Sequence, residues 1–185
     1  MVYDTMSLNP FLNQITNRNF LSPVGFQFVL QKKPKIDFFC NNASIPGINL
    51  GVAMQGSPLK AIPVPGETLT FEDLTLRFLV DEDMENYLEV WNWLCQFGFP
   101  KSFEQYQQLL NEDENSEGVQ NAISGMSDGT LIIYNSNYNP NIKVEFKDLF
   151  PVSLSSIVFD STPNDITYAS AEVVFKYTIY DIIKI

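Results

Sequence analysis

Short segments in which apolar and polar residues alternate recur along the chain, and a period of two is typical of half-buried β-strands. Residues 25–30 (GFQFVL) and 36–40 (IDFFC) each place three apolar side chains on one face. The sequence QKKPK, which contains Pro34, separates the two segments and carries a turn signal. The two segments are therefore predicted to pair as an antiparallel hairpin.

Further strands are predicted across the rest of the chain. The alternation returns at residues 69–80, 130–134, 141–146, 154–159 and 171–185. Leu69 and Phe71 differ in phase from Leu74, which predicts a bulge near Glu72 and Asp73. Six or seven strands with regular turn signals predict a mainly β fold, an antiparallel β-sandwich or barrel with one packed amphipathic helix and a long extended loop.

The helix is predicted to follow the strand that ends at residue 80. Asp81 is suited to the N-cap, and Gly98 with Pro100 ends the helical pattern. The apolar side chains at helical spacing are Met84, Tyr87, Leu88, Trp91, Leu94 and Cys95. This stripe is predicted to face the sheet, with Trp91 in the core. Trp93 lies off the stripe and is predicted to be either partly exposed or in contact with another subunit.

The segment 43–66 (ASIPGINLGVAMQGSPLKAIPVPG) departs from both patterns. It holds four prolines, four glycines and a single charge, Lys60. The prolines argue against a helix or a central strand, and the high apolar content argues against disorder. The segment is therefore predicted to be an irregular apolar arm that another protein surface covers.

The length of 185 residues fits a single domain. Residues 1–22 are predicted to form a loosely ordered leader, residues 23–185 the domain, and residues 101–129 an acidic surface insertion. No segment has the length and hydropathy of a membrane span, and the N-terminus does not resemble a signal peptide. Cys40 and Cys95 are predicted to be buried thiols, which points to a reduced, intracellular origin.

The formal net charge of -11 is unevenly distributed. Residues 1–66 hold five basic and two acidic residues, residues 67–128 two and fourteen, and residues 129–185 four and six. A positive arm region and a negative middle are expected to attract each other between copies of the chain. The alternative is that the acidic surface only keeps the protein soluble.

The chemistry of common enzymes is missing from the sequence. The chain has no histidine, which excludes a Ser-His-Asp or Cys-His pair, and it has no glycine-rich phosphate loop. No metal ligand set and no cofactor site are predicted. Catalysis by carboxylates such as Glu72 or Asp83 remains an alternative, although strand-end and helix-cap roles also explain these residues. An acidic chain is expected to repel nucleic-acid phosphates rather than bind them.

Several segments share their order and spacing with a known family. They are NFLSPVGFQFVL, FFCNNASIPGINLG, IPVPGETLTFEDLTLRFLVDED, MENYLEVWNWL, and FKDLFPVSLSSIVFD followed by NDITYASAEVVFKYTIY. The matching positions are Pro46-Gly47, then Gly66, Phe71, Asp73 and Thr75, then Asp81-Glu82. In these features the chain resembles the tail tube proteins of contractile-tailed bacteriophages, whose fold is shared with the tube proteins of type VI secretion. Asp148 stands where the family's G-L-x-P turn has glycine.

The resemblance implies a structural virion protein and no enzymatic activity. Hexameric rings of such a protein stack into the inner tube of a contractile tail, and phage DNA passes through the lumen without specific binding. The tail sheath and the baseplate or neck proteins are the implied partners, with assembly in the host cytoplasm. The alternatives are a ring that starts or ends the tube, a soluble β-sandwich binding module, and a carboxylate hydrolase.

Two sets of residues are candidates for these roles. The predicted contacts between subunits or rings are Ile45, Pro46, Ile48, Leu50, Val52, Met54, Leu59, Ile62, Val64 and Trp93. The predicted acidic residues of the lumen are Asp37, Glu145 and Glu172.

Overall fold

The computed structural model describes residues 19–31, 40–98, 104, 125–160 and 168–185. Asp37, the turn at residues 163–165, most of the predicted leader and most of the predicted acidic insertion lie outside these residues. The elements in chain order are β1 (Phe26–Leu30), β2 (Cys40–Ala43), β3 (Ile48–Gln55), β4 (Ile62–Phe71), β5 (Leu74–Leu79), α1 (Glu85–Gly98), β6 (Ser127–Tyr134), β7 (Pro140–Leu154), β8 (Ser170–Lys176) and β9 (Ile179–Lys184).

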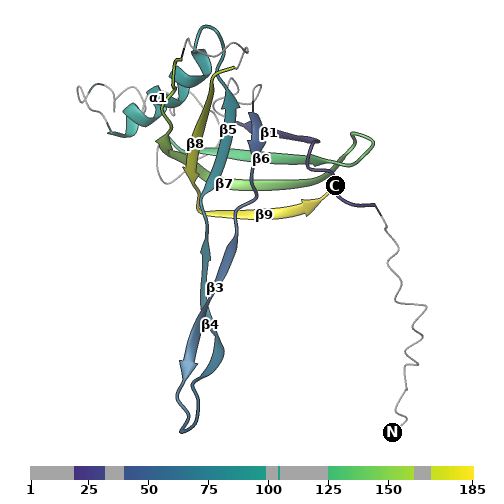
Figure 1. The fold of residues 1–185 in the computed structure, drawn as a ribbon, viewed down its shortest axis with the longest axis vertical. Helices are drawn as coiled ribbons and strands as arrows, with labels where there is room; N and C mark the ends of the chain where they lie inside the picture. Colours follow the sequence, from purple (N-terminus) through teal and green to yellow (C-terminus); the bar gives the residue numbers. More distant parts are fainter. Residues whose placement is uncertain (1–18, 32–39, 99–103, 105–124, 161–167) are drawn as a thin grey trace.

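Seven strands form one antiparallel sheet around the long strand β7. The order is β1-β6-β7-β8-β5-β2, and β9 also pairs with β7. The first half of β7 pairs with β6 on one edge and with β9 on the other, whereas its second half pairs with β8. The strands β6, β7 and β9 therefore run across the body, while β5 and β8 run along the longest axis (Figure 1). This confirms the predicted mainly β, antiparallel fold.

The core lies between these two parts of the sheet and beneath α1. Its largest fully buried side chains are Trp93, Phe28, Phe78, Phe146, Phe175, Leu30, Leu74, Leu76, Leu149, Val90 and Val144. In β5, β6 and β8 buried and half-exposed residues alternate, as the period of two in the sequence predicts. The predicted core face of β5, with Leu74, Leu76 and Phe78, is confirmed.

The predicted hairpin of residues 25–30 and 36–40 lies mostly outside the described residues, since only Cys40 of its second strand is described. β1 pairs with β6, and β2 pairs with β5 at the other end of the sheet. The partner of each strand depends on which strands, distant in sequence, complete the sheet around its buried residues.

Four other element boundaries also differ from the prediction. The expected bulge at Glu72 and Asp73 is a break between two strands, since β4 ends before it and β5 begins after it. The expected single closing strand is split at Tyr177 and Thr178, where the Thr178 N–H donates to the Lys147 carbonyl. Residues 155–159 are not a strand, because β7 ends at Leu154, and residues 127–129 belong to β6 rather than to the insertion.

The predicted buried face of the helix is correct only in part: Tyr87 and Leu94 pack against the core, but two other residues of the stripe do not. Leu88 and Trp91 are 48% and 40% exposed, whereas Asn86, Val90 and Trp93 are buried. The cause is a polar anchor: the Asn86 side-chain amide donates to the Leu79 carbonyl at 2.8 Å, and its oxygen accepts from the Asp81 N–H at 3.4 Å. The helix begins at Glu85, so the predicted N-cap Asp81 lies too far upstream.

Asp148 occupies a conformation that favours glycine. Its φ angle is 56°, and its N–H donates to the Asp128 carboxylate at 3.1 Å, beside a shift in the register of β6 and β7. This conformation explains why the family's turn pattern has glycine here.

We expect Asp148→Val to lower the free energy of unfolding by roughly 2 kcal/mol, and Asp148→Gly to change it by less than about 1 kcal/mol. Urea titration measures both, and equal effects of the two substitutions would contradict the strain.

Candidate assembly interface

The segment predicted as an irregular arm is a long β-hairpin. β3 and β4 pair with each other and with no other strand among the described residues, and they project away from the seven-stranded sheet (Figure 1). The expectation of irregular structure is therefore wrong. Pro63 and Pro65 pair with Met54 and Val52, and a proline fits such a ladder only where its nitrogen points away from the partner strand. The free edge of β4 therefore lacks two donors, which hinders another strand from adding there.

One face of the hairpin is apolar at every paired position. Residues directly opposite each other in an antiparallel pair share a face. The register places on this face Ile48, Leu50, Val52 and Met54 of β3 opposite Phe71, Leu69, Pro65 and Pro63 of β4. Five of them, Ile48, Leu50, Val52, Met54 and Leu69, are at least half exposed. A two-stranded hairpin has no core of its own, so this face requires a partner surface.

A pair of glycines shapes the middle of the arm. The register shifts between Leu50 and Val52, so Gly51 lies at an irregularity in the ladder. A Cβ atom added to Gly66 would lie 2.5 Å from the Gly51 carbonyl oxygen. The two backbones approach each other as closely as they do because neither residue has a side chain.

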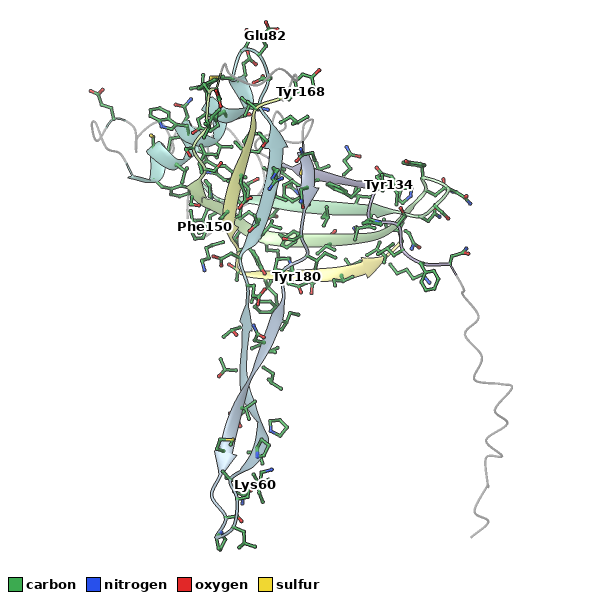
Figure 2. All side chains as sticks on the ribbon, in the orientation of Figure 1. Lys60, Glu82, Tyr134, Phe150, Tyr168 and Tyr180 are labelled. Atoms are coloured by element: carbon green, nitrogen blue, oxygen red, sulfur yellow. The ribbon has the colours of Figure 1, made fainter. Side chains whose placement is uncertain are left out.

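Two tyrosines hold the root of the arm. The Tyr180 hydroxyl donates to the Pro46 carbonyl at 2.9 Å, before β3, and the Tyr177 hydroxyl donates to the Glu72 carbonyl at 2.7 Å, after β4. Both rings also make edge contacts with Phe71, at centroid distances of 5.6 Å for Tyr180 and 6.3 Å for Tyr177. Figure 2 shows Tyr180 where the arm joins the sheet. We call Tyr177 and Tyr180 the root clamp.

The root clamp predicts a specific loss of stability. Tyr180→Phe leaves the Pro46 carbonyl without its buried partner, so we expect the free energy of unfolding to fall by about 1–3 kcal/mol. Tyr134→Phe is the matched control, because its hydroxyl bonds the Gln27 side chain at an exposed site. Chemical denaturation compares the two variants, and an equal loss in both would contradict the clamp.

The stability that the root clamp contributes depends on pH. Burial, followed by the influence of Tyr180, Asp73 and Glu72, raises the pKa of Tyr177 from 10.0 to about 12. The folded state therefore favours the neutral hydroxyl that donates to Glu72. The contribution of this group to stability is complete below pH 10 and is lost as the pH rises through about 12.

Most of the predicted contact residues are exposed on the arm. Ile45, Ile48, Leu50, Val52, Met54, Leu59 and Ile62 are between 42% and 99% exposed, and Val64 is half-buried. Two predicted contacts are not on the surface: Pro46 is buried at the root clamp, and Trp93 is 2% exposed in the core. Trp93 packs on Phe175, and its indole N–H donates to the Gly125 carbonyl at 2.8 Å.

Other exposed apolar residues were not among the predicted contacts. They include Leu69 on the arm, Val158 and Phe159 after β7, Tyr168 before β8, and Ile182, Ile183 and Ile185 at the C-terminus. The spacing of Leu69 two residues before Phe71 was visible in the sequence. The exposure of the others depends on the sheet pairings, which the sequence did not indicate.

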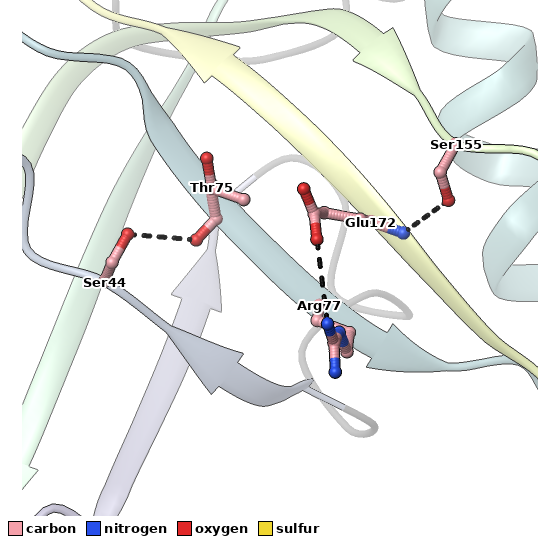
Figure 3. Close-up of polar contacts among 5 residues, drawn as sticks. All are labelled: Ser44, Thr75, Arg77, Ser155 and Glu172. Carbon is pink, nitrogen blue, oxygen red and sulfur yellow. Dashed lines mark hydrogen bonds and ion pairs between the residues drawn. The ribbon is translucent and has the colours of Figure 1, made fainter.

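The predicted acidic residues lie on the face of the sheet opposite the core. Glu172 faces Arg77 across the β5–β8 pair, with 4.0 Å between their charged atoms, and the Glu172 N–H donates to the Ser155 hydroxyl (Figure 3). Ser44 donates to the Thr75 carbonyl on the neighbouring strand in the same view. Glu145 pairs with Lys143 at 2.6 Å. Both carboxylates therefore have a cation beside them.

One further carboxylate on this face was not predicted. Asp181 lies directly opposite Glu145 in the β7–β9 pair, and it is exposed. It shares the face with Glu145, and so do Lys143 and Lys147, which lie two residues to either side of Glu145 in β7. This part of the sheet therefore carries two carboxylates and two lysines. The third predicted acidic residue, Asp37, lies outside the described residues.

The described residues contain no group of three or more Cys, Asp or Glu side chains arranged to hold a metal ion. None of their helices is long and apolar enough to cross a membrane.

The seven-stranded sheet with its projecting hairpin is a fold that known proteins share. Solved structures share the fold over nearly the whole chain. One is the sheath-tube complex of an extracellular contractile injection system, PVC, at 16% identity over 91% of this chain and 94% of that chain, with a TM-score of 0.56. Another is the tube-terminating cap of the anti-feeding prophage, at 16% identity over 97% of this chain and 100% of that chain, with a TM-score of 0.58. The PVC sheath/tube terminator is similar as well, at 17% identity over 90% of this chain and 99% of that chain, with a TM-score of 0.55. The fold is that of the tube proteins of contractile injection systems.

The sequence identifies the family. The family model described as phage tail tube protein matches residues 6–183, so the chain belongs to the phage tail tube protein family. A search of curated proteins gave no match. The protein therefore has a tube-type structural role and is not an enzyme, which confirms both predictions.

Proposed function

We propose that this chain forms hexameric rings that stack into the inner tube of a contractile tail. The observation that carries the proposal is the arm, because its apolar face projects into solvent and requires a second protein surface. The neighbouring ring supplies that surface. The exposed edges of the seven-stranded sheet pair between subunits within a ring, which removes the open edges.

DNA passes through the lumen of this tube on its way to the host. The net charge of -11 supports passage without binding, because an acidic protein repels phosphates. Glu145, Glu172 and Asp181 lie on the face of the sheet away from the core, and that face lines the lumen in this arrangement. The sheath and the baseplate or neck proteins are the partners, and the assembled tail in the virion, built in the host cytoplasm, is the location.

A second candidate is a ring that starts or ends the tube. The similarity to the tube-terminating cap and to the baseplate of the anti-feeding prophage favours it (TM-scores of 0.58 and 0.52). The two candidates differ in growth: a tube subunit adds rings without limit, whereas a terminal ring stops after one.

Light scattering over a concentration series tests the proposal. A tube subunit gives a mass that rises from the 21.1 kDa monomer to six subunits and then continues to increase with concentration. A mass that stays at six subunits favours the terminal ring. A constant mass of 21.1 kDa at every concentration, with and without the tail proteins that initiate the tube, contradicts both candidates.

A further inference from the structure

The two ends of the molecule's longest axis differ in charge. Lys60, the only charged residue between Ala43 and Gly66, lies at the tip of the arm, and Glu82 lies at the opposite end of the molecule (Figure 2). Residues 78–100 contain five carboxylates and neither lysine nor arginine. Among these carboxylates, Glu82 and Asp83 are exposed in the turn between β5 and α1. One end therefore offers a cation and the other end offers anions.

Each end also exposes apolar side chains beside its charge. At the arm tip Leu59 is 99% exposed, next to Lys60. At the other end, Leu88 in the first turn of α1 is 48% exposed and Tyr168 is 78% exposed. Tyr168 lies near Glu82 because the Val80 N–H donates to the Ala169 carbonyl, which joins the end of β5 to the start of β8. We call Glu82, Asp83, Leu88 and Tyr168 the receiving surface.

We propose that the arm tip of one copy docks on the receiving surface of the next copy, so that copies stack head to tail. This inference rests on the proposed tube function and names the surface that takes the arm. A copy displaced along the longest axis brings Lys60 toward Glu82 and Asp83, and Leu59 toward Leu88 and Tyr168. The contact joins two different surfaces, which is the geometry that allows stacking to continue. It also fixes the polarity of the stack, since tip against tip places two lysines together.

Charge reversal and its rescue test this contact. In Lys60→Glu we expect stacking to weaken roughly tenfold or more, because attraction becomes repulsion at every contact around a ring. Adding Glu82→Lys and Asp83→Lys to the same chain should restore stacking to within roughly threefold of the wild-type chain. The matched control is Lys147→Glu, which changes the same charge at an exposed residue of the central strand β7, outside the arm, the receiving surface and the free edges of the sheet. Negative-stain microscopy measures tube length, and light scattering measures mass.

Cross-linking of the wild-type chain provides a second measurement that needs no variant. A zero-length carbodiimide reagent joins an amine to a carboxylate only where they touch, so assembled protein should yield peptides that link Lys60 of one copy to Glu82 or Asp83 of another. Copies mixed as isotope-labelled and unlabelled chains show that the link is between molecules. About 0.5 M salt should reduce the yield, because the charges are exposed.

The outcomes separate this inference from the proposed function. Stacked rings that form equally well with Lys60→Glu, and give no cross-link at Lys60, overturn the docking but leave the tube intact. Stacking that Lys60→Glu weakens and the triple variant does not rescue also overturns the pairing with Glu82 and Asp83. Wild-type protein that forms neither rings nor stacks contradicts the tube function itself.

Discussion

Replacing Trp93 with alanine is expected to lower the free energy of unfolding by about 3–5 kcal/mol, the cost of truncating a large buried side chain. Trp93 is 2% exposed and packs on Phe175 with 5.9 Å between ring centroids. The substitution also leaves the Gly125 carbonyl without the indole N–H that donates to it. Denaturant titration followed by circular dichroism measures the loss.

Trp91 is the matched control for this prediction. It lies two residues away on the same helix and is 40% exposed, so Trp91→Ala should cost less than half as much as Trp93→Ala. The variant Trp91→Phe keeps Trp93 as its sole tryptophan. The fluorescence of this variant should therefore be that of a buried indole. A larger loss of stability in Trp91→Ala than in Trp93→Ala would contradict the orientation of α1.

Deleting residues 52–60 is expected to abolish the stacking of rings while the body of the protein stays folded. The deletion removes the tip of the arm and the outer half of β3, which pairs only with residues 62–65 of β4 and with no strand of the seven-stranded sheet. The root clamp and the seven-stranded sheet lie outside the deleted segment. The temperature of unfolding should therefore change little, whereas microscopy should show single rings without tubes.

A finer pair of substitutions separates the apolar face of the arm from the arm as a whole. Val52→Asp and Met54→Asp place a charge on the apolar face, whereas Ala53→Asp places the same charge on the other face of β3. Burying an unpaired carboxylate at an interface is costly, so the first two should reduce stacking at least roughly tenfold and the third much less. Equal effects of the three substitutions would show that the arm docks through its other face as well.

The faces of individual strands could be predicted from the sequence. The alternation that places Phe28 and Leu30 of β1 and Leu74, Leu76 and Phe78 of β5 on buried faces is a local property, and the structure confirms it. The partners of the strands could not be predicted this way. β2 pairs with β5, more than thirty residues further along the chain, and no local pattern records that choice.

The helix face was predicted only in part because its anchor is polar. A periodicity of apolar residues gives the same weight to Leu88 and Val90, and only the hydrogen bonds of Asn86 turn Val90 and Trp93 toward the core. Asn86 was not a candidate, because buried polar residues are rare and have no signature in a hydrophobic pattern.

The arm was recognised from its composition, but not its structure. Four prolines in 24 residues argue against a strand in a sheet with partners on both sides. The same prolines are compatible with a strand at the free edge of a hairpin. The sequence alone does not distinguish such an edge strand from an irregular loop. The root clamp was equally hidden, because Tyr180 lies 134 residues from Pro46 along the chain.

End-on imaging of the assembled wild-type protein tests the central claim most directly. The protein is incubated at high concentration, with and without the tail proteins that initiate the tube, and end views are averaged without imposed symmetry. The account predicts hollow rings with six-fold symmetry, and side views in which these rings stack into tubes. Particles without a lumen, or protein that remains monomeric under both conditions, would contradict it.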